Sequence, residues 1–272
     1  MLTSHFVRNG DILTAYHDEG SGEALLLLHG FTGSKLDFHD QIAWFSDRHR
    51  VLAPDQRGHG ESSNVGSADT YGFETLTADL AGYLDAIGVS RCHLLGHSMG
   101  GMVALRFALR HPQRLASLIL MDTSAEPLTI FPSALREQLA KEVRANGCAS
   151  RVGAMRAMPM GDAQARGRDF VGADEHWRRI ELKLSQMDPE AFVGLSEAIA
   201  VQPSVLGELA ALDVPTTIIV GEHDLPFIAP SARMAAAIRD ARLVTIPLAA
   251  HSPQYENADV WRGTIDAHLA RI

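Results

Sequence analysis

The chain alternates short apolar runs with longer amphipathic stretches, and this alternation limits its fold more than any other feature. Six apolar runs are bounded by Gly, Pro or Asp, at residues 24–28, 51–53, 92–95, 118–121, 217–220 and 243–246. Such runs, without polar alternation, are typical of strands buried on both faces of a parallel sheet. Helical stretches lie between and after them, at residues 35–48, 73–87, 99–110, 230–238 and 260–272. Alternating strands and helices predict right-handed crossovers and a doubly wound α/β sheet.

Two parts of the chain break this alternation and predict how the molecule is organised. Near the start, strand patterns at residues 5–7 and 12–17 flank an Asn-Gly pair, a hairpin signal that predicts an antiparallel start to a mostly parallel sheet. Between residues 126 and 210 the strand patterns stop, and helical patterns rich in Arg, Ala, Leu and Met replace them. The simplest organisation is a core domain of residues 1–125 and 211–272 with a helical cap, residues 126–210, inserted between two strands.

The composition excludes several classes of protein. With 272 residues, 46% of them hydrophobic, the chain is long enough to fold around its own core. A net charge of −9 argues against a nucleic-acid partner, because such binding needs clustered Lys and Arg. We expect no signal peptide and no membrane partner, since the longest aliphatic run, residues 25–28, is far shorter than the ~20 residues of a membrane span. Cys92 and Cys148 are expected to be free thiols, which favours a cytoplasmic protein; the oligomeric state stays open.

A Gly-His-Ser-Met-Gly-Gly motif at residues 96–101 is the first candidate for chemistry. It follows an apolar run and begins an amphipathic stretch. In this strand, turn and helix context, a G-x-S-x-G match indicates a catalytic serine. The sharp turn strains the serine backbone, and the glycines two residues away leave room for the neighbouring chain. The turn exposes the hydroxyl, while the helix N-terminus directs amide donors at a developing anion. Ser98 is therefore the predicted nucleophile.

A serine nucleophile needs a base, and the base needs a carboxylate that orients it. With a nucleophile on such a turn, the acid and then the base come later in the chain, each after a strand. Asp224 lies in the loop after one predicted strand and is the predicted acid, and His251 follows the next predicted strand and is the predicted base. Asp122, which ends the strand after the nucleophile helix, is a competing acid, and Glu222 is another.

The oxyanion of an acyl-transfer reaction needs two amide donors, one from the residue after the nucleophile and one from a loop after an earlier strand. Met99 supplies the first, and Phe31, in the loop after residues 24–28, supplies the second. No H-E-x-x-H motif and no paired His/Cys spacing predicts a metal site. His29, in the same loop as Phe31, is therefore interpreted as a structural, hydrogen-bonding histidine, and the same interpretation covers His59, His93 and His97.

Five short motifs together resemble successive signatures of the α/β-hydrolase superfamily. They lie at residues 29–31 (His-Gly-Phe), 55–62 (Asp-Gln-Arg-Gly-His-Gly-Glu-Ser), 96–101, 221–224 (Gly-Glu-His-Asp) and 250–252 (Ala-His-Ser). The resemblance implies the α/β-hydrolase fold, with an eight-stranded, mostly parallel sheet, helices on both faces and a helical cap after the sixth strand. It also implies that Arg57 and His59 belong to a structural turn, and that the cap shapes the pocket for a small-molecule substrate.

The resemblance predicts a serine hydrolase that cleaves a small ester or lactone through an acyl-enzyme, without metal or organic cofactor. Relatives that cleave carbon-carbon bonds of diketo or dienoate acids usually carry Gly-Pro-Gly where this chain has Gly-Phe-Thr-Gly at residues 30–33. This difference makes carbon-carbon bond cleavage a less favoured alternative without excluding it. An enol-lactonase, a peroxide-using relative and a hydrolase-fold receptor without turnover are further alternatives. In the cap, Met155, Met158 and Met160 are candidates to line the pocket; no substrate-binding residue is assigned, and none of the eight cap arginines is singled out.

Overall fold

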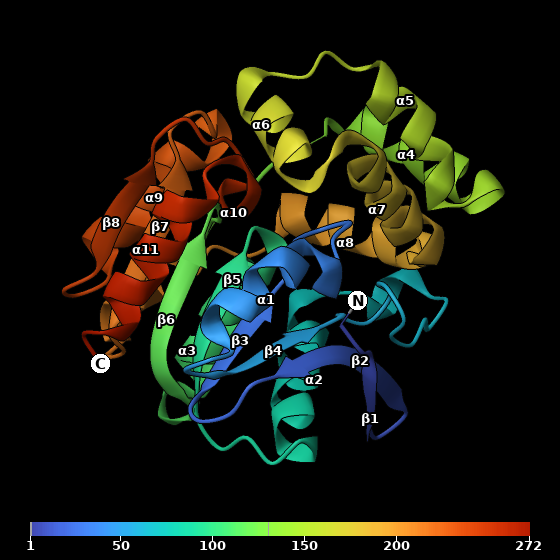
Figure 1. Cartoon of the computed structure of the whole chain (residues 1–272). Helices are drawn as coiled ribbons and strands as arrows, with labels where there is room; N and C mark the ends of the chain where they lie inside the picture. Colours follow the sequence, from blue (N-terminus) through green and yellow to red (C-terminus); the bar gives the residue numbers. More distant parts are fainter. Residues whose placement is uncertain (1, 130) are drawn as a thin grey trace.

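The computed structural model, described for residues 2–129 and 131–272, is built on one sheet of eight strands (Figure 1). The strand order is β1-β2-β4-β3-β5-β6-β7-β8. The strands are β1 His5–Asn9, β2 Ile12–Glu19, β3 Ala24–Leu28, β4 Arg50–Pro54, β5 Cys92–His97, β6 Leu115–Met121, β7 Thr216–Gly221 and β8 Arg242–Ile246. β2 pairs antiparallel with β1 and β4, and the remaining neighbours pair parallel. The predicted hairpin start and mostly parallel sheet are confirmed.

Helices cover both faces of the sheet because successive strand side chains point to opposite sides. In β3, Leu25 and Leu27 pack on the side of α1 and α11, whereas Leu26 and Leu28 pack on the side of α2 and α3. The helices outside the segment between β6 and β7 are η1 Lys35–Phe38, α1 His39–Phe45, η2 Ala68–Thr70, α2 Phe73–Ala86, α3 Met99–Arg110, η3 Pro112–Arg114, α9 Leu225–Ala237, α10 Pro253–Glu256 and α11 Ala258–Leu269, and η5 Leu206–Ala211 lies in that segment just before β7. The predicted α/β-hydrolase architecture is therefore confirmed.

Two predictions about individual elements were wrong. The run at residues 243–246 was expected to be buried on both faces, but β8 is the last strand of the sheet and Leu243 is 42% exposed. An edge strand has a neighbour on one side alone, so its burial depends on topology rather than on its own sequence. The helix expected at residues 230–238 begins earlier, at Leu225, because Asp224 stands at its N-cap and a proline follows in the first turn.

Between β6 and β7 the chain forms α4 Ser133–Asn146, η4 Cys148–Ser150, α5 Arg151–Ala157, α6 Asp162–Val171, α7 Ala173–Gln186 and α8 Pro189–Val201, here called the inserted helices. Figure 1 shows them gathered at one end of the molecule, above the sheet. Their burial differs: α5 buries no side chain and α7 buries only Leu184, whereas α8 packs into the core through residues such as Phe192 and Leu195. Within the described residues, no helix combines the length and apolar character needed to cross a membrane.

Candidate active site

Ser98 stands on a strained turn between β5 and α3. Its backbone has φ 53° and ψ −117°, a conformation that a residue with a side chain rarely adopts. A Cβ atom on Gly96 would lie 2.5 Å from the carbonyl oxygen of Gly100, and one on Gly100 would lie 2.5 Å from that of Leu28. Both contacts are with backbone, so both positions need glycine. The turn is held by the amide of Ser98, which donates to the carbonyl of Met121 at 2.8 Å.

The structure brings Ser98, His251 and Asp224 together at the C-terminal edge of the sheet. Ser98 Oγ is 3.1 Å from His251 Nε2, and His251 Nδ1 is 2.7 Å from Asp224 Oδ2. Ser98 and Asp224 are buried, and the side chain of His251 is 41% exposed. The two ring nitrogens thus connect a hydroxyl on one side to a carboxylate on the other, so the imidazole can accept the serine proton while the carboxylate stabilises the resulting cation.

Two aromatic rings hold the imidazole of His251 in place. The ring of Phe227, from α9, stacks on it at 4.9 Å between centroids, and the ring of His97 lies at 4.8 Å. His97 Nε2–H donates to the carbonyl oxygen of His251 at 2.7 Å. Burial lowers the pKa of His97 to about 3, so this histidine is neutral and acts as a structural donor. It contacts the site even though the sequence assigned it only a structural role.

The two competing acids lie in different surroundings. Glu222 is on the surface, where its Oε2 accepts from the amide of Leu248 at 2.8 Å. Asp122 is completely buried directly after β6, and its carboxyl lies in one cluster with Asp224 and His251, with ligating atoms within 4.8 Å of one another. A metal ion bound there would replace the hydrogen bond between His251 Nδ1 and Asp224.

Glu256 of α10 is a functional candidate that the sequence analysis missed. Its Oε2 accepts from the amides of Ala250 at 2.5 Å and Ser252 at 3.2 Å, the two residues that flank His251. Burial raises the pKa of Glu256 above its ordinary value. The carboxyl thereby holds the loop that carries the imidazole. Its position, five residues after the histidine at the end of a short helix, gives no signal without knowledge of how the loop folds back.

The two expected oxyanion donors lie on either side of Ser98. Met99 is the first residue of α3, and the amides of a first helical turn have no acceptor within the helix. The loop after β3 passes close by, since a Cβ atom on Gly30 would lie 3.1 Å from Ser98 Cβ. The next residue, Phe31, lines the same cavity as Ser98, and its ring packs against Phe192 of α8 at 5.1 Å.

A cavity of about 330 Å³ opens over Ser98 and His251. Its far wall is one face of α7, where His176, Arg179, Ile180 and Lys183 recur at helical spacing. Of the three methionines considered from the sequence, Met155 alone lines the cavity, and Met158 is 69% exposed. The cavity therefore combines a catalytic floor from the sheet with a partly charged wall from the inserted helices.

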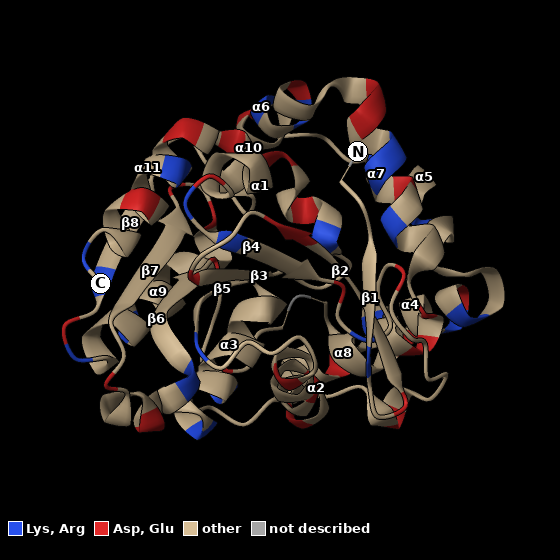
Figure 2. Cartoon of the chain, turned by 60° about the horizontal axis from the view of Figure 1, so that its bottom comes forward, with Lys and Arg blue, Asp and Glu red and all other residues tan. Residues whose placement is uncertain are grey.

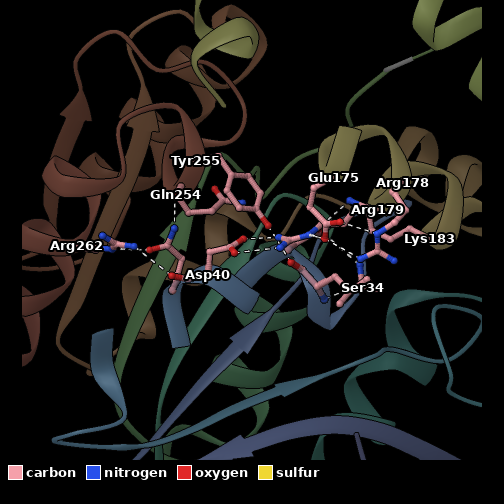
Figure 3. A network of polar contacts seen from close by, with 12 residues as sticks. Ser34, Asp40, Glu175, Arg178, Arg179, Lys183, Gln254, Tyr255 and Arg262 are labelled. Carbon is pink, nitrogen blue, oxygen red and sulfur yellow. Dashed lines mark hydrogen bonds and ion pairs between the residues drawn. The ribbon is translucent and has the colours of Figure 1, made fainter. Parts of the chain in front are cut away.

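Ion pairs fix α7 to the core, as Figure 3 shows. Arg179 donates to both carboxylate oxygens of Asp40, on α1, and to Glu175 of its own helix at 2.7 Å. Lys183 Nζ is 2.6 Å from Asp37 Oδ1, on η1. Burial by itself would raise the pKa of Asp37, but the positive charge of Lys183 and of other nearby groups outweighs this effect, so the pKa is lowered. The cations that line the cavity are thus already paired with carboxylates.

The remaining histidines near the site are structural. Burial lowers the pKa of His29 to about 4, and its ring donates from Nδ1 to the carbonyl of Gly30 at 2.8 Å while Nε2 accepts from the amide of Gln56 at 3.0 Å. His59 packs on His29 at 4.9 Å, and burial lowers its pKa to about 3. Arg57 pairs with Asp79 of α2 rather than with any cavity residue.

Comparisons with known proteins agree with this architecture. Residues 23–258 match the family described as alpha/beta hydrolase fold. A thermophilic esterase from Thermogutta terrifontis superposes with a TM-score of 0.83 at 29% identity, covering 99% of this chain and 98% of the esterase. The enol-lactonase from Burkholderia xenovorans LB400 does so with a TM-score of 0.83 at 25% identity, covering 98% and 100%. A non-heme haloperoxidase from Rhodococcus erythropolis is 30% identical over 268 residues, 93% of each chain. The chain belongs to the alpha/beta hydrolase fold family.

Proposed function

We propose that this enzyme is a serine hydrolase that cleaves a small ester or lactone through an acyl-enzyme. The observation that carries the proposal is the chain of two hydrogen bonds, 2.7 Å from Asp224 to His251 and 3.1 Å from His251 to Ser98, at the floor of a cavity. A nucleophile in contact with a base, which in turn contacts an orienting carboxylate, is the arrangement that activates a serine hydroxyl.

In the proposed mechanism, His251 Nε2 takes the proton of Ser98 as the hydroxyl oxygen attacks the substrate carbonyl. The amides of Phe31 and Met99 bind the resulting oxyanion, and Asp224 stabilises the imidazolium. The imidazolium then donates its proton to the departing alcohol, leaving an acyl-Ser98 ester. Water, deprotonated by His251, attacks this ester and releases the acid. No step uses a metal or an organic cofactor.

We further propose that residues 126–210, which include the inserted helices, act as a cap that selects the substrate. A volume of about 330 Å³ is at the lower end of the range for small-molecule sites, which favours short acyl and alcohol groups. The similarity to an enol-lactonase along 98% of the chain supports a second candidate within the same mechanism, an enol-lactone. In a lactone the leaving alcohol stays attached to the acyl group, so one cavity has to hold both.

The decisive experiment replaces the nucleophile. We expect Ser98→Ala to lower kcat for a short-chain p-nitrophenyl ester by at least about 10⁴-fold without unfolding the protein, because among the described residues Ser98 supplies the hydroxyl that contacts His251 Nε2. Ser150→Ala, at an exposed serine of η4, is the matched control and should retain full activity. Turnover in Ser98→Ala at the wild-type rate would refute the proposal.

A panel of p-nitrophenyl esters, lactones, an enol-lactone, a dienoate and an ester with added peroxide then identifies the substrate class. Activity should be lost in acid, because a protonated His251 cannot accept the serine proton. Stoichiometric labelling of Ser98 by a fluorophosphonate, with no turnover of any panel member, would instead indicate a binding protein on this fold.

A further inference from the structure

Asp122 is a buried carboxyl that the proposed mechanism leaves without a role. It lies directly after β6, between the strand ends that carry Ser98 and Asp224, and it adopts a left-handed backbone with φ 46°. Its side chain is completely inaccessible to solvent. Oδ1 accepts from the amide of Gly221 at 2.8 Å, whereas Oδ2 is buried and has no hydrogen-bond partner among the described residues. An ionised carboxylate would leave this oxygen unsatisfied, at a substantial free-energy cost.

The groups around Asp122 make its negative charge still more unfavourable. Asp224 and His251 share the cluster with it, and Glu256 of α10 adds another acidic group nearby. On the β5 side stands His97, which burial keeps neutral. No lysine or arginine within the described residues forms an ion pair with Asp122. Burial first, and then the negative charge of Asp224, raise the pKa of Asp122 well above its ordinary value.

We propose that Asp122 is a neutral positioning residue, whose Oδ2 keeps its proton at neutral pH and donates it in a hydrogen bond to the carboxylate of Asp224. Two adjacent carboxyl groups in a buried site share one proton more readily than they carry two charges. The inference rests on the proposed function, because Asp224 is taken there as the group that orients His251. Oδ2 then has an acceptor, and Gly221 fixes the other oxygen.

This arrangement has two effects on the proposed triad. The hydrogen bond holds the Asp224 carboxylate in the orientation that accepts from His251. The retained proton also limits the cluster to a single negative charge beside the imidazole. A second charge within 4.8 Å of His251 would favour its protonated form, and a protonated histidine cannot accept the serine proton.

Two substitutions separate a neutral donor from an ionised acid. Asp122→Asn keeps the shape, the acceptor for Gly221 and a donor toward Asp224, so we expect kcat/KM within about threefold of wild type and an unchanged midpoint of the acidic limb of the pH profile. Asp122→Leu removes the donor, and its kcat should fall by about 10- to 100-fold with KM little changed. If Asp122 were ionised, Asp122→Asn would move that midpoint to lower pH by about one unit or more, and this result would overturn the proposal.

A second measurement needs no catalysis, which keeps it separate from the proposed function. A carboxyl whose folded-state pKa is raised stabilises the fold fully below its unfolded-state pKa, near 3.8, and that stabilisation is lost as the pH rises toward the folded-state pKa. In Asp122→Asn the side chain does not ionise, so this decrease in stability does not occur. The urea midpoint of the variant should therefore rise relative to that of wild type as the pH increases from 4 to 8.

Glu222→Gln is the matched control, because it makes the same acid-to-amide change at an exposed carboxyl on the same edge of the sheet. Its midpoint relative to wild type should stay constant between pH 5 and 8. If the urea midpoint of Asp122→Asn relative to wild type stayed constant or fell with increasing pH, Asp122 would ionise normally. This conclusion does not depend on the result of the Ser98 experiment. A rising difference together with an active Ser98→Ala would leave Asp122 neutral and reject the triad instead.

Discussion

The sheet edge that carries Ser98 and the inserted helices α5 and α7, which line the cavity above it, are built by opposite means. β5, β6 and β7 are buried at every residue and contain no charged side chain, so hydrophobic packing and backbone hydrogen bonds fix the loops that follow them. α7 buries one side chain and carries six charged ones, and its position over the cavity depends on contacts such as Arg179 with Asp40. Figure 2 shows this contrast as tan central strands surrounded by helices with blue and red segments.

The contrast indicates a division of tasks between the two regions. Groups that have to meet within a hydrogen-bond distance are placed by the densely packed part, in which a small change in volume disturbs everything nearby. α7, which forms the far wall of the cavity, is held by exposed or half-buried ion pairs, which contribute less free energy and tolerate substitution. The three remaining predictions test this difference, beginning with the largest expected effect.

The first prediction compares two glycines, one from each region. Gly100→Ala in α3 would bring a Cβ atom within 2.5 Å of the carbonyl oxygen of Leu28 and 2.6 Å of that of His29, and neither backbone atom can move without displacing β3. We expect a loss of about 4 kcal/mol in the free energy of unfolding, measured in urea, together with loss of esterase activity.

Gly153→Ala in α5 is the matched substitution, because a Cβ atom there would meet nothing within 4 Å. It should stabilise the protein by about 0.5–1 kcal/mol, the helix-propensity difference between the two residues. If the alanine substitution were equally tolerated at Gly100 and Gly153, the proposed difference between the densely packed sheet edge and the loosely packed α5 would be contradicted.

The second prediction concerns acid pH, which should weaken the packed region first. Burial lowers the pKa of His29 to about 4, of His59 and His97 to about 3, and of His268 to about 4. Below pH 6.5 the unfolded chain gains protons at these positions and the folded chain does not, so stability falls as the pH decreases from 6.5 toward 4. One such histidine contributes about 2 kcal/mol between pH 6.5 and 5.

Urea midpoints measured from pH 8 to pH 5 test this sign. His268→Gln, in which the amide can still contact Thr217, should reduce the slope, and His5→Gln at an exposed position should leave it unchanged. Within residues 126–210, His176 is the sole histidine, so acid should affect the inserted helices less than the core. Greater stability at pH 5 than at pH 7 would reverse the expected sign.

The same contrast explains how much the sequence could predict. Ser98, Asp224 and His251 each follow an apolar strand closely, and strand ends of a parallel sheet meet at one edge, so local patterns were enough to select three residues that the structure brings together. Asp122 also follows such a strand, and for that reason sequence could not choose between it and Asp224 as the acid. Both are buried, and their different partners, Gly221 for Asp122 and His251 for Asp224, are visible only in three dimensions.

The cavity wall was less predictable because its contacts join distant parts of the chain. The helical spacing of His176, Arg179 and Lys183 defines one face of α7, but nothing in the sequence says that this face, rather than another, turns toward Ser98. Glu256 was missed for a related reason, since its carboxyl matters only when the loop after β8 folds back over α10.

The third prediction, with the smallest effect, compares two adjacent arginines of α7. Arg179 joins α7 to Asp40 of α1 and its side chain is 13% exposed, whereas Arg178, with its side chain 53% exposed, forms ion pairs among the described residues only with Glu175 of its own helix. Arg179→Ala should lower the free energy of unfolding by about 1–2 kcal/mol, because it breaks charged hydrogen bonds in a half-buried site. It should also raise KM several-fold with little change in kcat, since the wall of the cavity loosens while the sheet edge stays intact. Arg178→Ala should change stability by less than about 0.5 kcal/mol and leave KM unaltered, because exposed ion pairs contribute little. A fall in kcat as large as the rise in KM for Arg179→Ala would mean that α7 positions the catalytic groups as well, and the two regions could then not be assigned separate tasks.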